Sequence, residues 1–492
     1  MTSPGAVAAR WGVFVVAGIH LGIGLWLINR LSLWGDEAFS AQTVHLPLGA
    51  LLSMVTHIDI NMSAYYLMLK AWTSIFGHSE VALRLPSLLM TTATIFIAAR
   101  LVTRWFGPLP GLICALAVGM SPYFLTIGLT ARPFAMLGLL YVLTVACFVR
   151  ALGQSSLAPW LVLVVVDVLA LYTSLLAILF IAAQVGYLVL VDRRFYRIHV
   201  VAGVMLALGM IPTWLYLAPT NTLNWLTESD IPQVFANIIG DRSGLVFGVL
   251  VLAGLLFRPS ASGDTLISHP RSDLLLPGFV VLQLAVMVAL LPKQTLFIPP
   301  YLVTVLIAAA MLAGAVVVTF RPTLAWLTAS TLIASLFLGF SLNLEAQPGL
   351  ENQNWRSTTA FLDASVQPSD TVVFPNTFYR VAAEHYGHHG GYMDVGSPAL
   401  PASPWFSQTP YEYDRLKRTG YYLDADRFAD GLAGRERVWA VGPDDNFMAL
   451  ATSALTDAGW ALVDSHNFTG LTTRLFIHEV TKFPEHLDMS AS

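Results

Sequence analysis

Long apolar runs, separated by short polar stretches, fill residues 1–343 of the 492-residue chain. A helix needs about 20 apolar residues to cross a bilayer. The pattern therefore predicts a polytopic α-helical membrane protein with about eleven transmembrane helices, at residues 11–28, 85–102, 109–127, 134–149, 157–171, 175–191, 200–217, 245–257, 274–291, 299–318 and 324–342. The first run has no small-residue cleavage site behind it, so we expect a retained span and not a removed signal peptide.

The placement of arginine predicts the orientation of these spans, because cytoplasmic loops are enriched in Lys and Arg. Arg10 and the basic turn around Arg193 and Arg194 are expected in the cytoplasm. An odd number of spans then places the long first loop, residues 30–84, on the extracytoplasmic side together with the C-terminal region. Within that loop the apolar stretch 64–76 is too short to cross, and we expect a helix lying at the interface.

From residue 344 onward the apolar runs give way to a pattern typical of a soluble domain. Short β-branched and aromatic stretches at 370–374, 437–441, 461–464 and 471–480 predict strands, and 447–458 predicts a helix. We therefore predict two domains, a transmembrane module at 1–343 and an extracytoplasmic α/β domain at 344–492. The expected location is the cell membrane, spanned many times.

Composition narrows the partners. The chain is 56% hydrophobic and only 11% charged, and its net charge of −4 argues against nucleic acid. Its two cysteines, Cys114 and Cys147, both lie inside apolar runs, so we expect neither a disulfide framework nor a thiolate metal site.

Two adjacent acids, Asp36 and Glu37, stand just beyond the first span of this sparsely charged chain. One explanation is a solvated loop or a helix N-terminus, where acids complement the helix dipole. The alternative is catalysis, because the external loops also carry further titratable groups: His57, Asp59, Arg84, Arg132, Asp241, Arg242 and Lys293. Sugar transfer from a lipid-linked phosphate needs this mixture, since the acceptor hydroxyl requires a carboxylate base and the leaving phosphate requires fixed positive charge.

Several short motifs then occur in a recognisable order: Trp-Gly-Asp-Glu-Ala at 34–38, Asp59 followed by tyrosines at 65–66, Phe-Gly-His-Ser-Glu at 76–80 and Leu-Arg-Leu-Pro-Ser at 83–87. In this order they resemble the N-terminal module of the GT-C membrane glycosyltransferases. The branch is glycosyltransferase family 39 and its relatives, which include protein O-mannosyltransferases and the lipid A aminoarabinose transferase. The resemblance covers residues 11–200 best, and Trp355-Arg356 resembles the start of the external domain of many relatives.

The resemblance implies a role for each matching residue. Asp36 matches the first-loop aspartate assigned as catalytic base, Glu37 its acidic neighbour and Asp59 the second acid of that loop. Arg84 matches the arginine at the external start of the second span, and Arg132 lies in the matching second external loop. These two, with Lys293 as the cation nearest the tenth span, are the residues expected to bind the donor phosphate.

The chain also departs from the family pattern at three places. Relatives often read Asp-x-His-Pro-Pro before the tyrosines, where this chain has Asn61-Met62-Ser63. The loop before the tenth span often ends in Arg-Tyr, where this chain has Pro300-Tyr301 with Lys293 as the nearest cation. Some relatives have an aspartate after the second-loop arginine, which is missing at 134–136.

Several assignments stay open at this point. Glu37 fits a partner of the base, a metal ligand or a helix-start acid, and Arg84 fits an interface anchor as well as a phosphate ligand. His20 and Asp167 lie inside spans, where buried pairing is the ordinary explanation. No cofactor is firmly predicted, and a divalent cation remains an alternative. The histidines that invite a metal site are more often simply solvated: His57, His385, His388 and His389.

The sequence thus predicts an inverting glycosyltransferase that uses a polyprenyl-phosphate-sugar donor and a lipid, glycan or protein acceptor. The reaction is expected on the extracytoplasmic side of the membrane, and membrane lipids are expected to surround the protein. The rival function is a transporter or flippase of lipid-linked glycans. Transporters tend to contain inverted repeats and broken spans, and the apolar pattern shows neither. A non-catalytic assembly protein is a second rival.

Overall fold

The structure is a computed structural model, and it describes residues 4–57, 60–154, 156–192, 197–211, 252, 256, 274–290, 299–316, 353–374, 377–387, 392–394, 435–443 and 446–478. The chain divides into two compact units. We call them the helical unit, Met1–Asn29 with Met54–Leu350, and the C-terminal unit, Arg30–Ser53 with Glu351–Ser492. The division predicted after residue 343 lies outside the described residues and stays a prediction. The first part of the long loop groups with the C-terminal region.

The described helices of the helical unit follow the apolar runs of the sequence. They are α1 (Pro4–Leu27), α4 (Ser63–Phe76), α5 (Glu80–Phe106), α6 (Pro108–Gly119), α7 (Pro122–Gly128), α8 (Phe134–Leu152), α9 (Ala158–Thr173), α10 (Ala177–Tyr187), α11 (Arg197–Gly209), α15 (Leu275–Leu290) and α16 (Val303–Val316). A short 3-10 turn, Ile60–Met62, precedes α4. A π-helical turn, Leu188–Asp192, follows α10, and the 3-10 turn Pro299–Leu302 precedes α16.

Three of these helices, α1, α5 and α8, are long and apolar enough to cross a membrane, and α6 with α7 makes a fourth if the bent pair is one span. Shorter apolar helices occur in α9, α10, α11, α15 and α16. These helices confirm the prediction of a polytopic helical membrane protein. The count of eleven stays a prediction, because the runs at 245–257 and 324–342 lie almost wholly outside the described residues.

The third run corrects the expectation of unbroken spans. It forms two helices, α6 and α7, that meet at an angle of 66°. Pro122 lacks a backbone N–H and is disfavoured inside a helix, although it fits the first turn of a new one. Ser121 completes the break, because its hydroxyl oxygen accepts a hydrogen bond of 3.4 Å from the Phe124 N–H as an N-cap.

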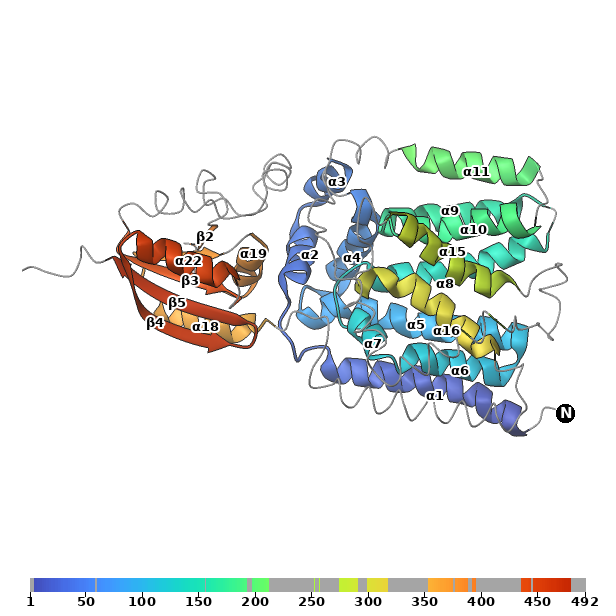
Figure 1. Cartoon of the computed structure of the whole chain (residues 1–492), viewed down its shortest axis with the longest axis horizontal. Helices are drawn as coiled ribbons and strands as arrows, with labels where there is room; N and C mark the ends of the chain where they lie inside the picture. The colour runs from blue at the N-terminus through green and yellow to red at the C-terminus, as the bar shows by residue number, and fades with distance from the viewer. Residues whose placement is uncertain are drawn as a thin grey trace, which may run out of the picture. The chain divides into compact units, whose positions relative to one another are not determined.

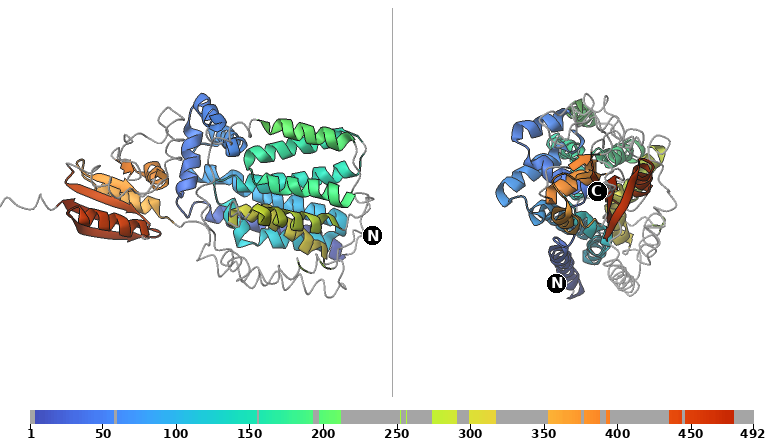
Figure 2. Two further views of the ribbon diagram at one scale, coloured as in Figure 1. Left: turned by 45° about the horizontal axis from the view of Figure 1, so that its top comes forward. Right: turned by 90° about the vertical axis from the view of Figure 1, so that its left-hand side faces the viewer.

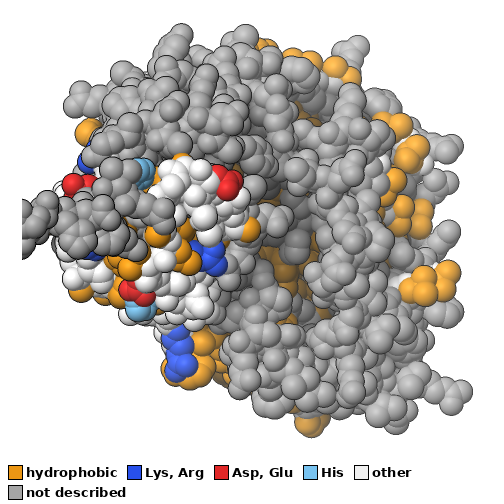
Figure 3. Space-filling view, turned by 60° about the vertical axis from the view of Figure 1, so that its left-hand side comes forward, with side chains coloured by type: hydrophobic (Ala, Val, Ile, Leu, Met, Phe, Trp, Pro, Cys, Tyr) orange, Lys and Arg blue, Asp and Glu red, His pale blue; other side chains and the backbone are white. Residues whose placement is uncertain are grey.

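The helices of this unit lie alongside one another (Figures 1 and 2), with α6 packed against α1, α5 and α16. Glycines permit the closest approaches. A Cβ on Gly314 of α16 would lie 2.6 Å from the Pro110 carbonyl oxygen of α6. Large hydrophobic side chains also face outward, for example Trp11 and Val165, each 67% exposed. Figure 3 shows such hydrophobic side chains in one part of the described surface and charged and polar side chains mixed in another.

The C-terminal unit contains a five-stranded sheet in the order β2-β1-β3-β5-β4. The strands are β1 (Thr371–Phe374), β2 (Tyr392–Asp394), β3 (Arg437–Gly442), β4 (Trp460–Phe468) and β5 (Leu471–His478). The first three are parallel, and β5 pairs antiparallel with β3 and β4. The four predicted strands are confirmed, and so is the predicted helix, which is α22 (Asn446–Asp457).

Among its described residues this unit also contains α18 (Trp355–Ser365), α19 (Thr377–Tyr386) and α2 (Gly35–His45). The core packs α22 onto the sheet through a cluster of buried apolar residues: Val373, Val438, Ala440, Met448, Leu455, Trp460 and Phe476. Figure 1 shows α18 on the opposite side of the sheet from α22. α3 (Leu48–His57) follows α2 along the chain.

Candidate active site

The acid pair opens helix α2. The chain is extended at Trp34, and Gly35, Asp36 and Glu37 form the first turn of the helix. Acids in a first turn are stabilised by the unpaired N–H groups and the dipole of the helix. The helix is buried along most of its length and packs against α19 within the C-terminal unit.

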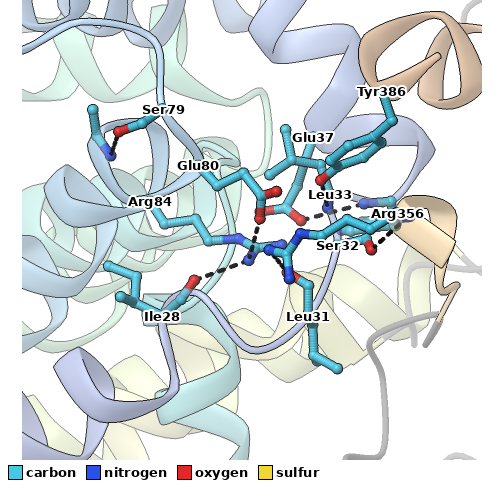
Figure 4. A network of polar contacts seen from close by, with 12 residues as sticks. Ile28, Leu31, Ser32, Leu33, Glu37, Ser79, Glu80, Arg84, Arg356 and Tyr386 are labelled. Atoms are coloured by element: carbon cyan, nitrogen blue, oxygen red, sulfur yellow. Dashed lines mark hydrogen bonds and ion pairs between the residues drawn. The ribbon is translucent and has the colours of Figure 1, made fainter. Parts of the chain in front are cut away.

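Glu37 is the buried member of the pair, with no exposed surface. Its Oε2 atom accepts a hydrogen bond from the Trp34 N–H at 3.4 Å, so the carboxylate reaches back to the residue before the helix. A glutamate at this position that bonds the N-cap amide is half of a capping box. Of the alternatives left open by the sequence, the helix-start acid therefore agrees best with the contacts of Glu37 (Figure 4).

Asp36 is only half-buried. Its backbone carbonyl accepts a hydrogen bond from the Ser40 hydroxyl at 3.0 Å, which is a contact of the helix and not of the carboxylate. The two acids thus have different surroundings although they are adjacent. Of the two acids, Asp36 is the one with exposed surface.

Arg84 lies in the second turn of α5, because this helix begins at Glu80, earlier than the predicted start at residue 85. Its side chain is buried, and Nη1 donates a hydrogen bond of 3.0 Å to the Ile28 carbonyl. The same atom lies 3.7 Å from Glu80 Oε2 (Figure 4). Ile28 directly follows α1, whose last carbonyls lack partners within the helix. Arg84 therefore stabilises the C-terminal end of α1.

Arg132 lies in the short connection between α7 and α8 and is half-buried. Its backbone N–H donates to the Thr130 carbonyl at 2.9 Å, and the Thr130 hydroxyl donates to carbonyls of the last turn of α7. The connection is therefore held in a defined conformation by its own backbone. The other two candidates, Asp59 and Lys293, lie outside the described residues and stay predictions.

The structure gives a reason for one departure from the family pattern. The Asn61 side-chain oxygen accepts a hydrogen bond of 2.6 Å from the Leu175 N–H, and the Ser63 hydroxyl donates to the Tyr172 carbonyl at 3.4 Å. These two side chains connect the start of α4, with the 3-10 turn before it, to the last turn of α9 and the residues that follow it. Sequence reasoning missed this role, because nothing in the local pattern relates residues more than 100 positions apart.

At the second departure, Pro300-Tyr301, the tyrosine makes an aromatic contact. The Tyr301 ring lies 6.0 Å from the ring of Phe134, the first residue of α8. The contact joins the 3-10 turn before α16 to the residue that follows the Arg132 connection. Asp241 and Arg242 lie outside the described residues.

The histidine candidates do not form a cluster among the described residues. His385 is half-buried at the end of α19 and contacts the Tyr386 ring, with 4.9 Å between ring centroids. The side chain of His57 and both residues His388 and His389 lie outside the described part of the structure. Within the described part, no group of three His, Cys, Asp or Glu residues is arranged to hold a metal ion.

The predicted pairing of polar groups inside spans is confirmed. His20 contacts the Gly119 carbonyl and the Thr91 hydroxyl, both at 3.0 Å. Asp167 Oδ1 accepts hydrogen bonds from the Thr144 hydroxyl at 2.9 Å and from the Gln184 amide at 3.2 Å. All of these partners are neutral, and they lie on other helices than the titratable residue itself. His20 therefore connects α1 to α5 and α6, and Asp167 connects α9 to α8 and α10.

Comparisons with known proteins agree with this fold. Residues 62–216 match the family described as dolichyl-phosphate-mannose-protein mannosyltransferase. A search of the curated proteins finds no match. The crystal structure of ArnT from Cupriavidus metallidurans in the apo state superposes with a TM-score of 0.63 at 15% identity, covering 95% of this chain and 98% of that one.

A second crystal structure, of ArnT from Cupriavidus metallidurans bound to undecaprenyl phosphate, gives a TM-score of 0.62 at 13% identity and covers 94% of this chain and 97% of that one. The chain therefore has the fold of ArnT along nearly its whole length. Together with the family match, this fold confirms the resemblance to the GT-C membrane glycosyltransferases that the sequence motifs predict.

Proposed function

We propose that the protein is a glycosyltransferase that moves a sugar from a polyprenyl-phosphate-linked donor to an acceptor hydroxyl, with inversion at the anomeric carbon. The observation that carries the proposal is the fold shared with ArnT, one structure of which holds undecaprenyl phosphate. Polyprenyl phosphate is the carrier that remains once such a donor has given up its sugar. The family matched by residues 62–216 is also named for a polyprenyl-type phosphate sugar.

In this proposal Asp36 is the general base. Its carboxylate takes the proton of the acceptor hydroxyl as the oxygen attacks the anomeric carbon, and polyprenyl phosphate leaves from the opposite face. A base must be within hydrogen-bond reach of the proton that it removes. The half-exposed Asp36 meets the requirement of access better than the fully buried Glu37, which supports the first turn of α2.

The leaving phosphate requires cations, and we assign this role to Arg132 and Lys293, with Arg84 as a weaker candidate. Arg84 is buried, and its guanidinium already contacts Glu80 and the Ile28 carbonyl. Arg132 is half-buried in a short connection, where a guanidinium can present its paired donors to phosphate oxygens. Asp59 keeps its assignment as the second acid of the first loop.

The distribution of arginines supports an extracytoplasmic site in the cell membrane, because the basic turns then face the cytoplasm. The acceptor is the hydroxyl of a lipid, glycan or protein. The broken pair α6 and α7 is a feature that transporters also show. The comparisons nevertheless favour a transferase over a transporter, since they match a mannosyltransferase family and the fold of ArnT.

The test is a transfer assay with the purified chain in lipid vesicles, using a labelled polyprenyl-phosphate sugar and an acceptor extract. Asp36→Asn should lower kcat by about 10²–10⁴-fold, the contribution typical of a general base. Asp457→Asn is the matched control and should leave kcat unchanged, because Asp457 is exposed at the end of α22. Full activity of Asp36→Asn would contradict the assignment, and a retained anomeric configuration would contradict inversion.

The same assay decides the metal alternative. If a divalent cation assists Asp36, a chelator should abolish transfer and added cation should restore it. Unchanged turnover in the chelator would remove the metal from the reaction.

A further inference from the structure

The segment that leads into α2 is held by residues more than 300 positions later in the chain. The Leu33 N–H donates to the Tyr386 hydroxyl at 2.6 Å. Arg356 contacts the segment twice, since Nη2 donates to the Leu31 carbonyl at 3.2 Å and its backbone N–H donates to the Ser32 hydroxyl at 3.3 Å. Figure 4 shows Arg356 and Tyr386 reaching this segment from α18 and α19.

Two of these contacts hold backbone groups, the Leu33 N–H and the Leu31 carbonyl, that lie in neither a helix nor a strand. Leu33 has no exposed surface and Ser32 is 8% exposed, so water is excluded from the backbone around them. A buried backbone N–H is almost always paired, because an unpaired one costs as much as a lost hydrogen bond. At Leu33 the partner is a single side-chain hydroxyl, that of Tyr386.

The hold continues into the helix itself. The Gln42 side-chain amide, in the second half of α2, donates to the Val381 carbonyl of α19 at 3.3 Å. Tyr386 and Val381 both belong to α19. This one helix therefore contacts both α2 and the segment that leads into α2. Asp36 lies between these two contacts along the chain.

We infer that Arg356 and Tyr386 are positioning residues for the acid at Asp36, which means that the C-terminal unit sets the direction of the catalytic carboxylate. The inference rests on the proposed function, in which Asp36 is the base. Leu33 is only three positions before Asp36, so a change of backbone direction at Leu33 is passed to the first turn of α2. Misplacing a catalytic group by about 1 Å can cost about a hundred-fold in rate.

The experiment compares Tyr386→Phe and Arg356→Ala with the wild-type chain in vesicles. Tyr386→Phe removes only the hydroxyl, and Arg356→Ala removes the guanidinium from the Leu31 carbonyl. The matched control is Arg474→Ala, because Arg474 donates to the Thr452 hydroxyl at 2.7 Å and to the Met448 carbonyl at 3.4 Å, both on α22. The control thus weakens the same unit without touching the segment of Leu31, Ser32 and Leu33.

Two readouts separate positioning from general stability. Hydrogen exchange of a peptide covering residues 30–37 should be about ten-fold faster or more in Tyr386→Phe, with exchange in β3 and β5 unchanged, because one buried hydrogen bond is lost. In Tyr386→Phe and in Arg356→Ala, kcat should fall about ten- to a hundred-fold while KM for the donor stays the same. Arg356→Lys should restore part of the loss, since a lysine retains a donor for the Leu31 carbonyl.

Two results would overturn the inference. One is exchange in Tyr386→Phe that is unchanged at 30–37, or raised equally over the whole unit as expected of Arg474→Ala. The other is faster local exchange with unchanged kcat, which would mean that the segment does not set the base. If the wild-type chain transfers no sugar, the proposed function fails, and the exchange result alone still decides whether Arg356 and Tyr386 hold the segment.

Discussion

The two units of the chain solve opposite packing problems. In the helical unit, side chains such as Trp11 and Val165 face outward, while the buried carboxylate of Asp167 bonds to neutral partners. In the C-terminal unit the apolar residues form the interior, as Phe476 does with no exposed surface. Its buried carboxylate, Asp370, lies 3.0 Å from the cationic Arg437 Nε and accepts a hydrogen bond from the Trp439 indole.

This difference teaches which surroundings each unit is built for. A unit that is apolar outside and pairs its few polar groups inside fits a lipid bilayer, where unsatisfied polar groups are costly. A unit with an apolar interior and a mixed surface fits water. The acid pair at Asp36 and Glu37 belongs to the second kind of unit, although the sequence connects it directly to the first span.

The largest expected effect comes from an arginine on the apolar surface of the helical unit, compared with an arginine on the surface of the C-terminal unit. Val165→Arg, near the middle of α9, should destabilise membrane insertion of that helix by about 3 kcal/mol, the cost of arginine at a span centre. Thr456→Arg, at an exposed position of α22, should change stability by no more than about 0.5 kcal/mol. The measurement is the inserted fraction of α9 together with the thermal stability of each variant in vesicles. Equal tolerance of both changes would break the comparison.

The hydropathy pattern predicted most of the elements of both units, for a physical reason. An apolar run long enough to span a membrane indicates a helix without further information. A short stretch of β-branched and aromatic residues, as in β3, indicates a strand in the same way. The missed elements lack that evidence. The strand β2 has only three residues, and in α18 the first residue, Trp355, is followed by four polar residues, Arg-Ser-Thr-Thr at 356–359.

The site was predictable only in part. The motif order indicates Asp36 and Glu37, yet the sequence leaves three roles open for Glu37, and its burial is a property of the packed unit. Arg84 likewise reads as an external cation, although its guanidinium bonds to the end of α1. The holding of Leu33 by Tyr386 depends on a contact across 353 positions, which no local pattern can show.

The next effect in size tests the role of Glu37. Glu37→Ala removes the carboxylate that accepts a hydrogen bond from the Trp34 N–H. The loss should loosen the first turn of α2 and lower kcat about ten- to a hundred-fold. Glu37→Gln retains a side-chain oxygen that can accept from the Trp34 N–H, so kcat should stay near that of the wild-type chain. Steady-state kinetics with a labelled donor measures both variants. A Gln variant as slow as the Ala variant would show that the charge of Glu37 is required.

The smallest effect concerns Asp167, where the comparison of the units is sharpest. Asp167→Ala should cost about 0.6–1.7 kcal/mol, the range measured for hydrogen bonds between membrane helices. Asp370→Ala should cost about 1–3 kcal/mol, since it leaves the buried Trp439 indole N–H without its acceptor and the Arg437 guanidinium without its ion-pair partner. Unfolding followed separately in each unit gives the two values.

Asp167→Asn adds a functional control to this pair, because asparagine keeps an oxygen for the Thr144 hydroxyl and the Gln184 amide. Its sugar transfer should equal that of the wild-type chain, in contrast to Asp36→Asn. If Asp167→Asn instead abolished activity while folding was retained, the buried carboxylate would have a role in moving ions or substrate through the helical unit. That result would contradict the conclusion that Asp167 only connects helices of the unit. It would favour the transporter function over the transferase.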